Sequence, residues 1–292
     1  MRYIKPSFTE IKDLKPYDFI ALVGHNCYQV DRTNDNEAFV KRLIKNRHLA
    51  MVEHYSYVAK INSKLFDRLI KANNRFLTLV RDNRKCYVEF NLRILLETFD
   101  QDKNSPILDL VSLLDDDIIA LFEGYEKREV KGKLLSKASI SRLPQHLYDK
   151  MKFVTLKIIT DRGVTHELVR HRICSFAQES TRYCNYAKDK FGNELTFILP
   201  IDYKENKKFY DESFAKDEES YLAMMKEGIA PELARSILPN KLKTSIIVTC
   251  SVDEWKKIFE LRTSPRAHPD MREIMIPIKE YFLKKGYLKW SL

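Results

Sequence analysis

The sequence predicts an α+β fold in which mixed helices surround a central, largely antiparallel sheet. Helical and strand-like patterns alternate irregularly along the chain, which is not typical of a wound parallel sheet. Two strand-like runs at 75–80 and 85–90 flank a polar turn and predict an antiparallel hairpin. Glycine is scarce, with seven in 292 residues, and no two glycines have the spacing of a dinucleotide-binding turn or a P-loop. Neither of those nucleotide-binding motifs is present.

In the first half of the chain, the spacing of apolar residues predicts each element. A polar start at 33–35 precedes apolar residues at helical spacing, and Tyr55, Tyr57 and Ala59 alternate as in a half-buried strand. We expect a helix over 36–47, a strand over 55–61, a short helix from Ser63, the hairpin at 75–90 and a helix over about 107–125.

In the second half, Gly163 turns the chain from a strand into a helix. We expect strands over 153–159, 195–199 and 245–252, and helices over 164–172, 205–227, 231–238, 253–262 and 269–285. The helix at 205–227 is densely charged, which predicts an exposed position.

The composition is that of a soluble globular protein, with 44% hydrophobic and 32% charged residues. No apolar run approaches the roughly 20 residues of a membrane-spanning helix, and the first residues lack the pattern of a secretory signal. Five scattered cysteines form no C-x-x-C pair, so we expect free thiols in a reducing compartment and no disulfides. These features predict a cytoplasmic protein without a membrane segment.

The net charge of +10 leaves three interpretations open. A basic surface can bind nucleic acid through its phosphates. It can also steer small polyanions such as nucleotides into a basic pocket. A merely lysine-rich, soluble surface is the third possibility. Charge alone does not decide among them.

Residues 161–183 hold the densest polar information in the chain. His166-Glu167 followed by His171 resembles the H-E-x-x-H motif of zinc proteases, but the second histidine stands five residues after the first. On a helix, that spacing separates the imidazoles by about 140°. Arg170 occupies the required position and would repel the metal. We therefore predict no metal site.

Arg170, His171 and Arg172 are three consecutive residues that can carry positive charge. Their side chains diverge by about 100° per residue on a helix, so they would reach different groups of one large polyanion. Ser180, Thr181 and Arg182 follow ten residues after Arg170, and hydroxyl and guanidinium groups suit phosphate oxygens. Alone, such a tripeptide is more often an ordinary basic helix end.

Arg170-His171-Arg172, seven residues and then Ser180 match the R-H-R-x7-S motif, and this stretch resembles the flavin-dependent thymidylate synthase family. Three further blocks occur in the family's order. They are His48-x4-Glu53-His54, the Glu232–Pro239 block with Ala-Arg235-x-x-Leu-Pro, and a C-terminal block from Trp255 through Leu261-Arg262 to Ile274. The resemblance covers roughly residues 1–62 and 150–285.

The resemblance implies an activity and a set of site residues. The enzyme would be a homotetramer with shared active sites, and FAD reduced by NADPH would act with methylenetetrahydrofolate to convert dUMP to dTMP. The implied flavin ligands are His48, Glu53, Arg170, His171, Arg172 and Gln178. The implied dUMP ligands are Glu167, Arg170, Gln178, Glu179, Ser180, Thr181, Arg182, Arg235 and Arg262. Arg262 is the implied catalytic residue, because a guanidinium beside the uracil ring favours the ionised ring.

The chain departs from the family at three places. Residues 63–150 have no counterpart in the shortest members, and we expect a helical and hairpin insertion within a single domain of residues 1–292. Ala50 replaces a threonine that contacts the flavin in many members. Ser251-Val252-Asp253 replaces an Asn-x-Arg set, so a negative charge stands where the family offers a positive one.

Two alternatives to thymidylate synthesis remain. A paralogue of the same fold would bind or alkylate a pyrimidine nucleotide without this reaction. A basic nucleic-acid-binding protein would bind polyanions tightly, lose affinity with salt and carry no yellow chromophore.

Overall fold

The computed structural model describes residues 1–29 and 35–288. Its centre is a four-stranded sheet in which every neighbouring pair of strands is antiparallel, as the sequence predicts. In spatial order the strands are β2 (Ser7–Ile11), β7 (Phe153–Asp161), β10 (Lys243–Ser251) and β8 (Ser175–Gln178).

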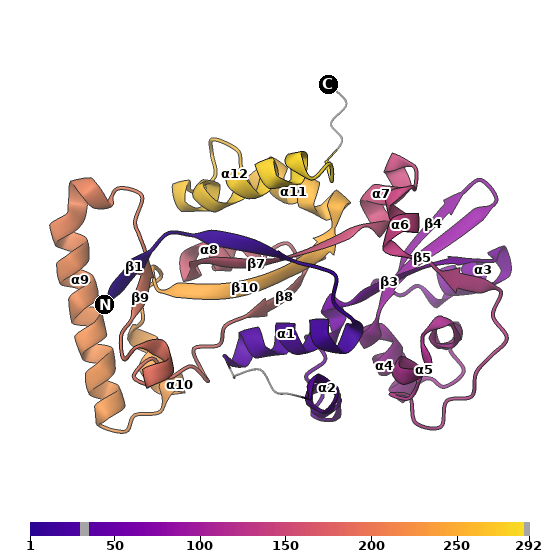
Figure 1. The fold of residues 1–292 in the computed structure, drawn as a ribbon, viewed down its shortest axis with the longest axis horizontal. Coiled ribbons are helices and arrows are strands. Elements are labelled where there is room, and N and C mark those ends of the chain that lie inside the picture. The colour runs from indigo at the N-terminus through magenta and orange to yellow at the C-terminus, as the bar shows by residue number, and fades with distance from the viewer. Residues whose placement is uncertain (30–34, 289–292) are drawn as a thin grey trace.

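Helices cover both faces of the central sheet (Figure 1). On one face, α11 (Val252–Arg262) and α12 (Pro269–Lys284) bury Trp255, Phe259 and Phe282 completely against β7 and β10. On the other face, α1 (Pro16–Tyr28) packs Phe19 and Val23 against Ala177 and Ile247. Fully burying side chains of this size contributes about 1.5–3 kcal/mol each relative to exposure, so the apolar alternation of β7 and β10 holds the sandwich together.

Residues 56–134 build a second antiparallel sheet beside the first (Figure 1). Its spatial order is β4 (Thr78–Asp82), β5 (Lys85–Asn91), β3 (Ser56–Ile61) and β6 (Gly132–Leu134). The predicted hairpin at 75–90 is confirmed as β4 and β5. The predicted strand at 55–61 is confirmed as β3, whose sheet partners are β5 and β6.

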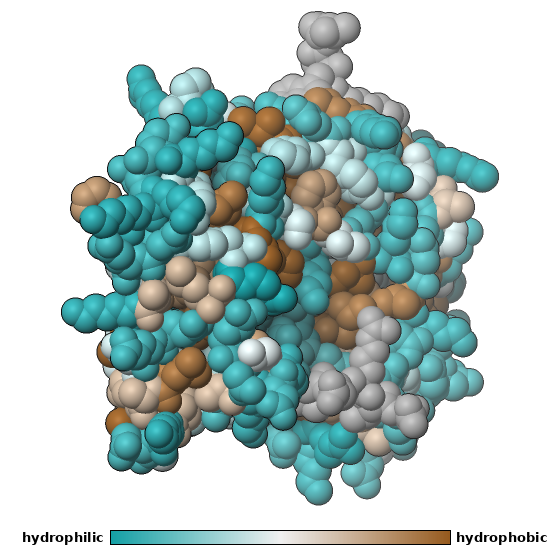
Figure 2. Space-filling model, turned by 60° about the vertical axis from the view of Figure 1, so that its left-hand side comes forward, coloured by the Kyte–Doolittle hydropathy of each residue, from teal (hydrophilic) through white to brown (hydrophobic). Residues whose placement is uncertain are grey.

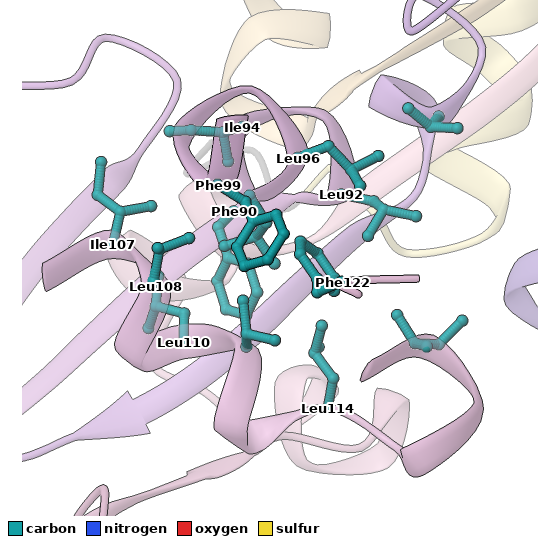
Figure 3. Packing of buried hydrophobic residues seen from close by; sticks show 14 of the residues in the cluster. Phe90, Leu92, Ile94, Leu96, Phe99, Ile107, Leu108, Leu110, Leu114 and Phe122 are labelled. Atoms are coloured by element: carbon teal, nitrogen blue, oxygen red, sulfur yellow. The ribbon is translucent and has the colours of Figure 1, made fainter. Parts of the chain in front are cut away.

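The core of this second sheet is continuous with the N-terminal helices. Phe90 and Phe99 meet Leu108 and Phe122 at its centre (Figure 3). The same cluster includes Ile20 of α1, as well as residues from α2 (Asn36–Lys45) and η1 (Val52–His54). The helices on this sheet are α3 (Ser63–Ala72), α4 (Leu92–Gln101), η2 (Pro106–Leu113), α5 (Asp116–Ile119), α6 (Lys137–Ser141) and α7 (Gln145–Met151).

A third layer lies at the opposite end of the molecule (Figure 1). Parallel strands β1 (Arg2–Ile4) and β9 (Thr196–Ile198) pack against the long helix α9 (Tyr203–Lys226). Short helices precede and follow it, namely η3 (Asp189–Phe191), α10 (Pro231–Ala234) and η4 (Arg235–Ile237). Most of α9 is exposed, as its charge density predicts, and hydrophilic residues cover most of the face that Figure 2 shows.

The single helix predicted over 107–125 is wrong. The chain forms the 3-10 helix η2, becomes extended at Leu114 and then makes only the short α5. Three consecutive aspartates, 115–117, follow Leu114, and the Asp117 carboxylate accepts from the backbone N–H of Ile118. Aspartate has a low helix propensity, so three in a row favour a break at this point.

Three other expectations have clear outcomes. Of the polar helix start at 33–35, Asp35 caps α2 by accepting from Ala38 N, and residues 33 and 34 lie outside the described residues. All five cysteines are free and buried, as expected. Within residues 1–29 and 35–288, no helix combines the length and apolar character that crossing a bilayer requires.

Candidate active site

The R-H-R segment follows a short helix, α8 (Arg162–Leu168), at the end of β7. Asp161 begins α8 by accepting a hydrogen bond from Val164 N at 2.8 Å. The helix ends at Leu168, earlier than the predicted 172, so Arg170, His171 and Arg172 lie in the turn that leads into β8. Within this turn the three side chains have different environments: His171 is buried, whereas Arg170 and Arg172 are exposed.

Arg262, at the end of α11, reaches back onto this turn. Its Nε donates to His171 Nε2 at 3.1 Å. Its Nη1 donates to Glu167 Oε2 at 2.7 Å, and its Nη2 donates to the Glu167 carbonyl oxygen at 2.9 Å. These bonds use three of the five guanidinium N–H groups. The Arg262 side chain is half-buried. It is held in one orientation by α8 and the turn after it, both of which are distant from Arg262 in sequence.

The environment of His171 favours a neutral imidazole. Burial lowers its pKa, and the Arg262 guanidinium lowers it further, while Glu254 opposes both effects. A neutral His171 can accept the Arg262 hydrogen bond, whereas an imidazolium could not. His171 therefore serves as the acceptor that holds the guanidinium.

A cavity of about 690 Å³ opens beside Arg262. Residues that line it include Glu167, Glu260, Ser264, Arg266 and His268. Its walls combine the guanidinium groups of Arg262 and Arg266 with the carboxylates of Glu167 and Glu260, and the Glu167 carboxylate is already paired with Arg262. A polar ring that develops negative charge would be stabilised there.

At the other end of β8, Gln178 and Glu179 make internal contacts. Gln178 Nε2 donates to Thr165 Oγ1 at 3.0 Å and to Thr244 Oγ1 at 3.2 Å, which ties β8 to α8 and β10. Glu179 is almost fully buried and accepts from Tyr186 Oη at 3.0 Å and Lys243 Nζ at 2.6 Å. A buried carboxylate requires such partners, because an unpaired buried charge costs several kcal/mol.

Ser180 lies at the end of α1. Its backbone N–H donates to the Cys27 carbonyl oxygen at 3.0 Å, which sets the turn against the helix. The Tyr28 ring contacts the Tyr183 ring of this turn in a tilted arrangement, and the Tyr28 hydroxyl is hydrogen-bonded to His48 Nδ1 at 2.7 Å. The structure thus brings His48 close to the 180–183 turn, and the buried Thr181 lies within that turn.

Three predicted residues lie at the margins of these groups. The Arg182 guanidinium pairs with Glu232 of α10 at 3.0 Å, and Arg235 is exposed one residue after α10. Glu53 pairs with Arg93 of α4 at 2.7 Å, so its carboxylate faces the second sheet. The salt bridge of Arg182 places it and Arg235 on the same side of the molecule.

The predicted residues fall into two groups at opposite ends of β8. Glu167, His171 and Arg262 lie before the strand, on the face covered by α8 and α11. Ser180 and His48 lie after it, beside α1 on the other face. Four strand residues span about 13 Å. Within one chain, the Arg262 group and the Ser180 group lie on different faces of the central sheet, and the Gln178–Thr165 hydrogen bond links β8 to α8 between them.

Comparison with known proteins identifies the family. The model of the thymidylate synthase complementing protein family matches residues 139–285, which is half of the chain and includes the R-H-R turn, Arg235 and Arg262. The chain belongs to this family.

Curated relatives of this family member are flavin-dependent thymidylate synthases. The protein from Pyrococcus furiosus is 36% identical over 137 residues, which cover 44% of this chain and 55% of that protein. The protein from Geobacter sulfurreducens is 33% identical over 115 residues, which cover 39% and 49%. The chain spans about half the length of the curated relatives it matches. Among solved structures, the UMP/dUMP methylase PolB from Streptomyces cacaoi is 18% identical, with a TM-score of 0.42 over 47% of this chain and 70% of that one.

The structure shows where the two small departures from the family pattern lie, namely Ser251-Val252-Asp253 and Ala50. Ser251 caps α11 by accepting from Glu254 N at 3.2 Å. Asp253, in the first turn of the same helix, pairs with Lys257 at 3.3 Å and is 41% exposed. An acidic residue at this position is favoured by the helix dipole. Ala50 is exposed next to the buried Leu49.

Sequence reasoning missed several residues of the site. Tyr28 and Tyr183 link His48 to the Ser180 turn, and Lys243 neutralises Glu179. Tyr183 belongs to the stretch that follows Ser180 but was given no role there, and Tyr28 and Lys243 lie outside the motifs. Glu254 faces His171 from a helix start, where the S-x-x-E spacing from Ser251 signals only a cap.

Proposed function

We propose that this family member is a flavin-dependent thymidylate synthase that converts dUMP to dTMP. The arrangement that carries the proposal is Arg262, held by His171 and Glu167 beside a polar cavity. A fixed guanidinium next to the uracil ring would favour its ionised form and make C5 electron-rich enough to accept a one-carbon unit. The similarity to curated relatives named flavin-dependent thymidylate synthases supports the same reaction.

The residues of the R-H-R turn suit a flavin that carries a pyrophosphate. Among the described residues, no carboxylate pairs with the Arg170 or Arg172 guanidinium, so both cations are available to an anion. Arg172 is followed by Ile173, whose side chain is 76% exposed and offers an apolar contact to a ring. These residues would hold the FAD with His171, His48, Glu53 and Gln178. The bound flavin would supply hydride chemistry, with NADPH as the reductant and methylenetetrahydrofolate as the carbon donor.

The two groups at opposite ends of β8 support a shared active site. In this proposal, Gln178, Glu179, Ser180, Thr181, Arg182 and Arg235 of one subunit line the dUMP, and Glu167, Arg170 and Arg262 come from a neighbour. Apolar side chains are exposed around Arg170 and Arg262, at Val169, Ile173 and Leu261. Such exposed residues would be buried between subunits. We therefore propose a homotetramer.

Two further features belong to the proposal. The continuous core between α1, α2 and the second sheet supports one domain of residues 1–292, with 63–150 as an insertion within it. The family match at 139–285 covers neither residues 1–62 nor most of this segment, so the insertion stays a prediction. Five free, buried cysteines support a reducing compartment such as the cytoplasm.

The test is a turnover assay on the purified full chain. dUMP, methylenetetrahydrofolate, NADPH and FAD should give dTMP, and the protein should show a flavin spectrum that changes when dUMP is added. Binding of flavin and dUMP without formation of dTMP would indicate a paralogue that does not catalyse this reaction. Salt-sensitive binding to nucleic acid with neither flavin nor dUMP binding would instead favour a nucleic-acid-binding protein.

A further inference from the structure

Glu254 is a buried carboxylate that faces the R-H-R turn. It occupies the third helical position of α11, where a glutamate after a serine cap would be expected to bond back to the cap. Its oxygens have other neighbours: Oε2 lies 3.0 Å from Lys257 Nζ, and Oε1 lies 3.9 Å from His171 Nδ1. Only 8% of its side chain is exposed. The capping role therefore does not account for its placement.

The hydrogen bond from Arg262 defines the tautomer of His171. A guanidinium N–H can only donate, so the accepting Nε2 of His171 carries a lone pair. Because burial and Arg262 keep this imidazole neutral, its single proton is on Nδ1. Nδ1 lies 3.9 Å from Glu254 Oε1, which is beyond hydrogen-bond range, so the carboxylate acts on it through its charge. The opposite tautomer would place a lone pair toward the carboxylate and an N–H toward the Arg262 N–H, and both contacts would be repulsive.

We infer that Glu254 is a positioning residue, whose charge stabilises the His171 tautomer that accepts from Arg262 and thereby supports the orientation of the Arg262 guanidinium. The functional part of this inference rests on the proposed role of Arg262 toward dUMP. The charged groups facing the imidazole come from both ends of α11: Glu254 at its start and Arg262 at its end. With the guanidinium held by His171 and Glu167, two of its N–H groups have no acceptor among the described residues and are available to a ligand.

The link between Glu254 and His171 is tested by the titration of His171 in the full-length protein. NMR of histidine-labelled protein gives its midpoint, and His171→Asn identifies the signal. Glu254→Gln should lower the midpoint, because it removes the charge that raises the His171 pKa. Glu254→Asp, which keeps the charge, should stay closer to wild type. Glu280→Gln, at an exposed site on α12, should leave the midpoint unchanged. An unchanged midpoint in Glu254→Gln would overturn the inference.

The link to Arg262 is tested by a double-mutant cycle on dUMP binding, measured by calorimetry. Glu254→Gln should weaken binding about fivefold in the wild-type background and cause no further loss in Arg262→Ala. Equal losses in both backgrounds would show that Glu254 acts independently of Arg262, and would overturn the inference. If Arg262→Ala alone binds dUMP like wild type, the proposed role of Arg262 fails, while the His171 titration still decides the Glu254–His171 link.

Discussion

Arg262 Nε lies 3.1 Å from His171 Nε2, although 91 residues separate the two in sequence. The contact joins the end of α11 to the turn before β8. A residue of the central motif thus acts on the candidate catalytic residue of the C-terminal block. The two blocks form one unit, and the apolar packing of α8 and α11 on the same sheet face keeps them together.

We predict that Arg262→Ala abolishes dTMP formation and leaves flavin affinity nearly unchanged. Charge-assisted hydrogen bonds contribute about 1.5–3 kcal/mol each, so dUMP affinity should fall at least about tenfold. Turnover assays, dUMP calorimetry and a flavin titration measure the three quantities. Arg75→Ala serves as the control, because it removes an exposed arginine from the loop between α3 and β4 of the second sheet. Wild-type turnover in Arg262→Ala would refute its catalytic assignment.

We predict that the active species is a tetramer with shared sites. Sedimentation should show it, and a mixture of Arg182→Ala and Arg262→Ala subunits should regain activity that neither variant has alone. If each site combines Arg182 of one subunit with Arg262 of another, random exchange restores roughly a quarter of the sites. An active monomer, or no recovery after verified subunit exchange, would contradict the shared-site proposal.

We predict that the protein purifies with little flavin, because Asp253 adds a negative charge near the proposed flavin region. Asp253→Arg combined with Ser251→Asn should tighten flavin binding, and Ser251→Asn alone should change it little, since asparagine also caps helices. Fluorescence quenching during a flavin titration measures the affinity. Equal affinities for wild type and the double variant would mean that Asp253, which pairs with Lys257 in this structure, acts only within α11.

We predict that stability falls as the pH decreases below 6.5, in part because of His54. This side chain is buried and bonded to Thr249 Oγ1 at 2.8 Å, and burial lowers its pKa from 6.5 to about 3. Between these values the unfolded chain binds a proton that the folded state excludes. His54 alone therefore costs about 1.4 kcal/mol per pH unit in that window, and nothing above it.

Urea unfolding at several pH values measures this slope. His54→Gln removes the titrating group and should make the slope shallower below pH 6.5. His166→Gln, at an exposed position, should leave the slope as in wild type. Equal slopes in His54→Gln and wild type would show that His54 does not carry the effect.

Periodicity predicted most elements because burial follows it directly. The strands predicted at 153–159 and 245–252 are the two central strands: β7 ends two residues later than predicted, and β10 starts two residues earlier and ends one earlier. The prediction failed at 107–125, where three aspartates of low helix propensity interrupt the apolar spacing, and at 164–172, where the helix ends at Leu168. Helix propensity and the path of the chain into β8 decide where these helices end, and hydrophobic spacing reports neither.

By itself, the sequence determined the family, the antiparallel α+β architecture and the identity of the motif residues, since these depend on residue type, order and spacing. Only the tertiary structure decided which of these residues meet. It joined His171 to Arg262 and set Glu254 behind them, and it placed Ser180 and His48 at the far end of β8. The reason is physical: hydrogen bonds and ion pairs form over about 3 Å, and strand pairing and helix packing bring distant segments to that range.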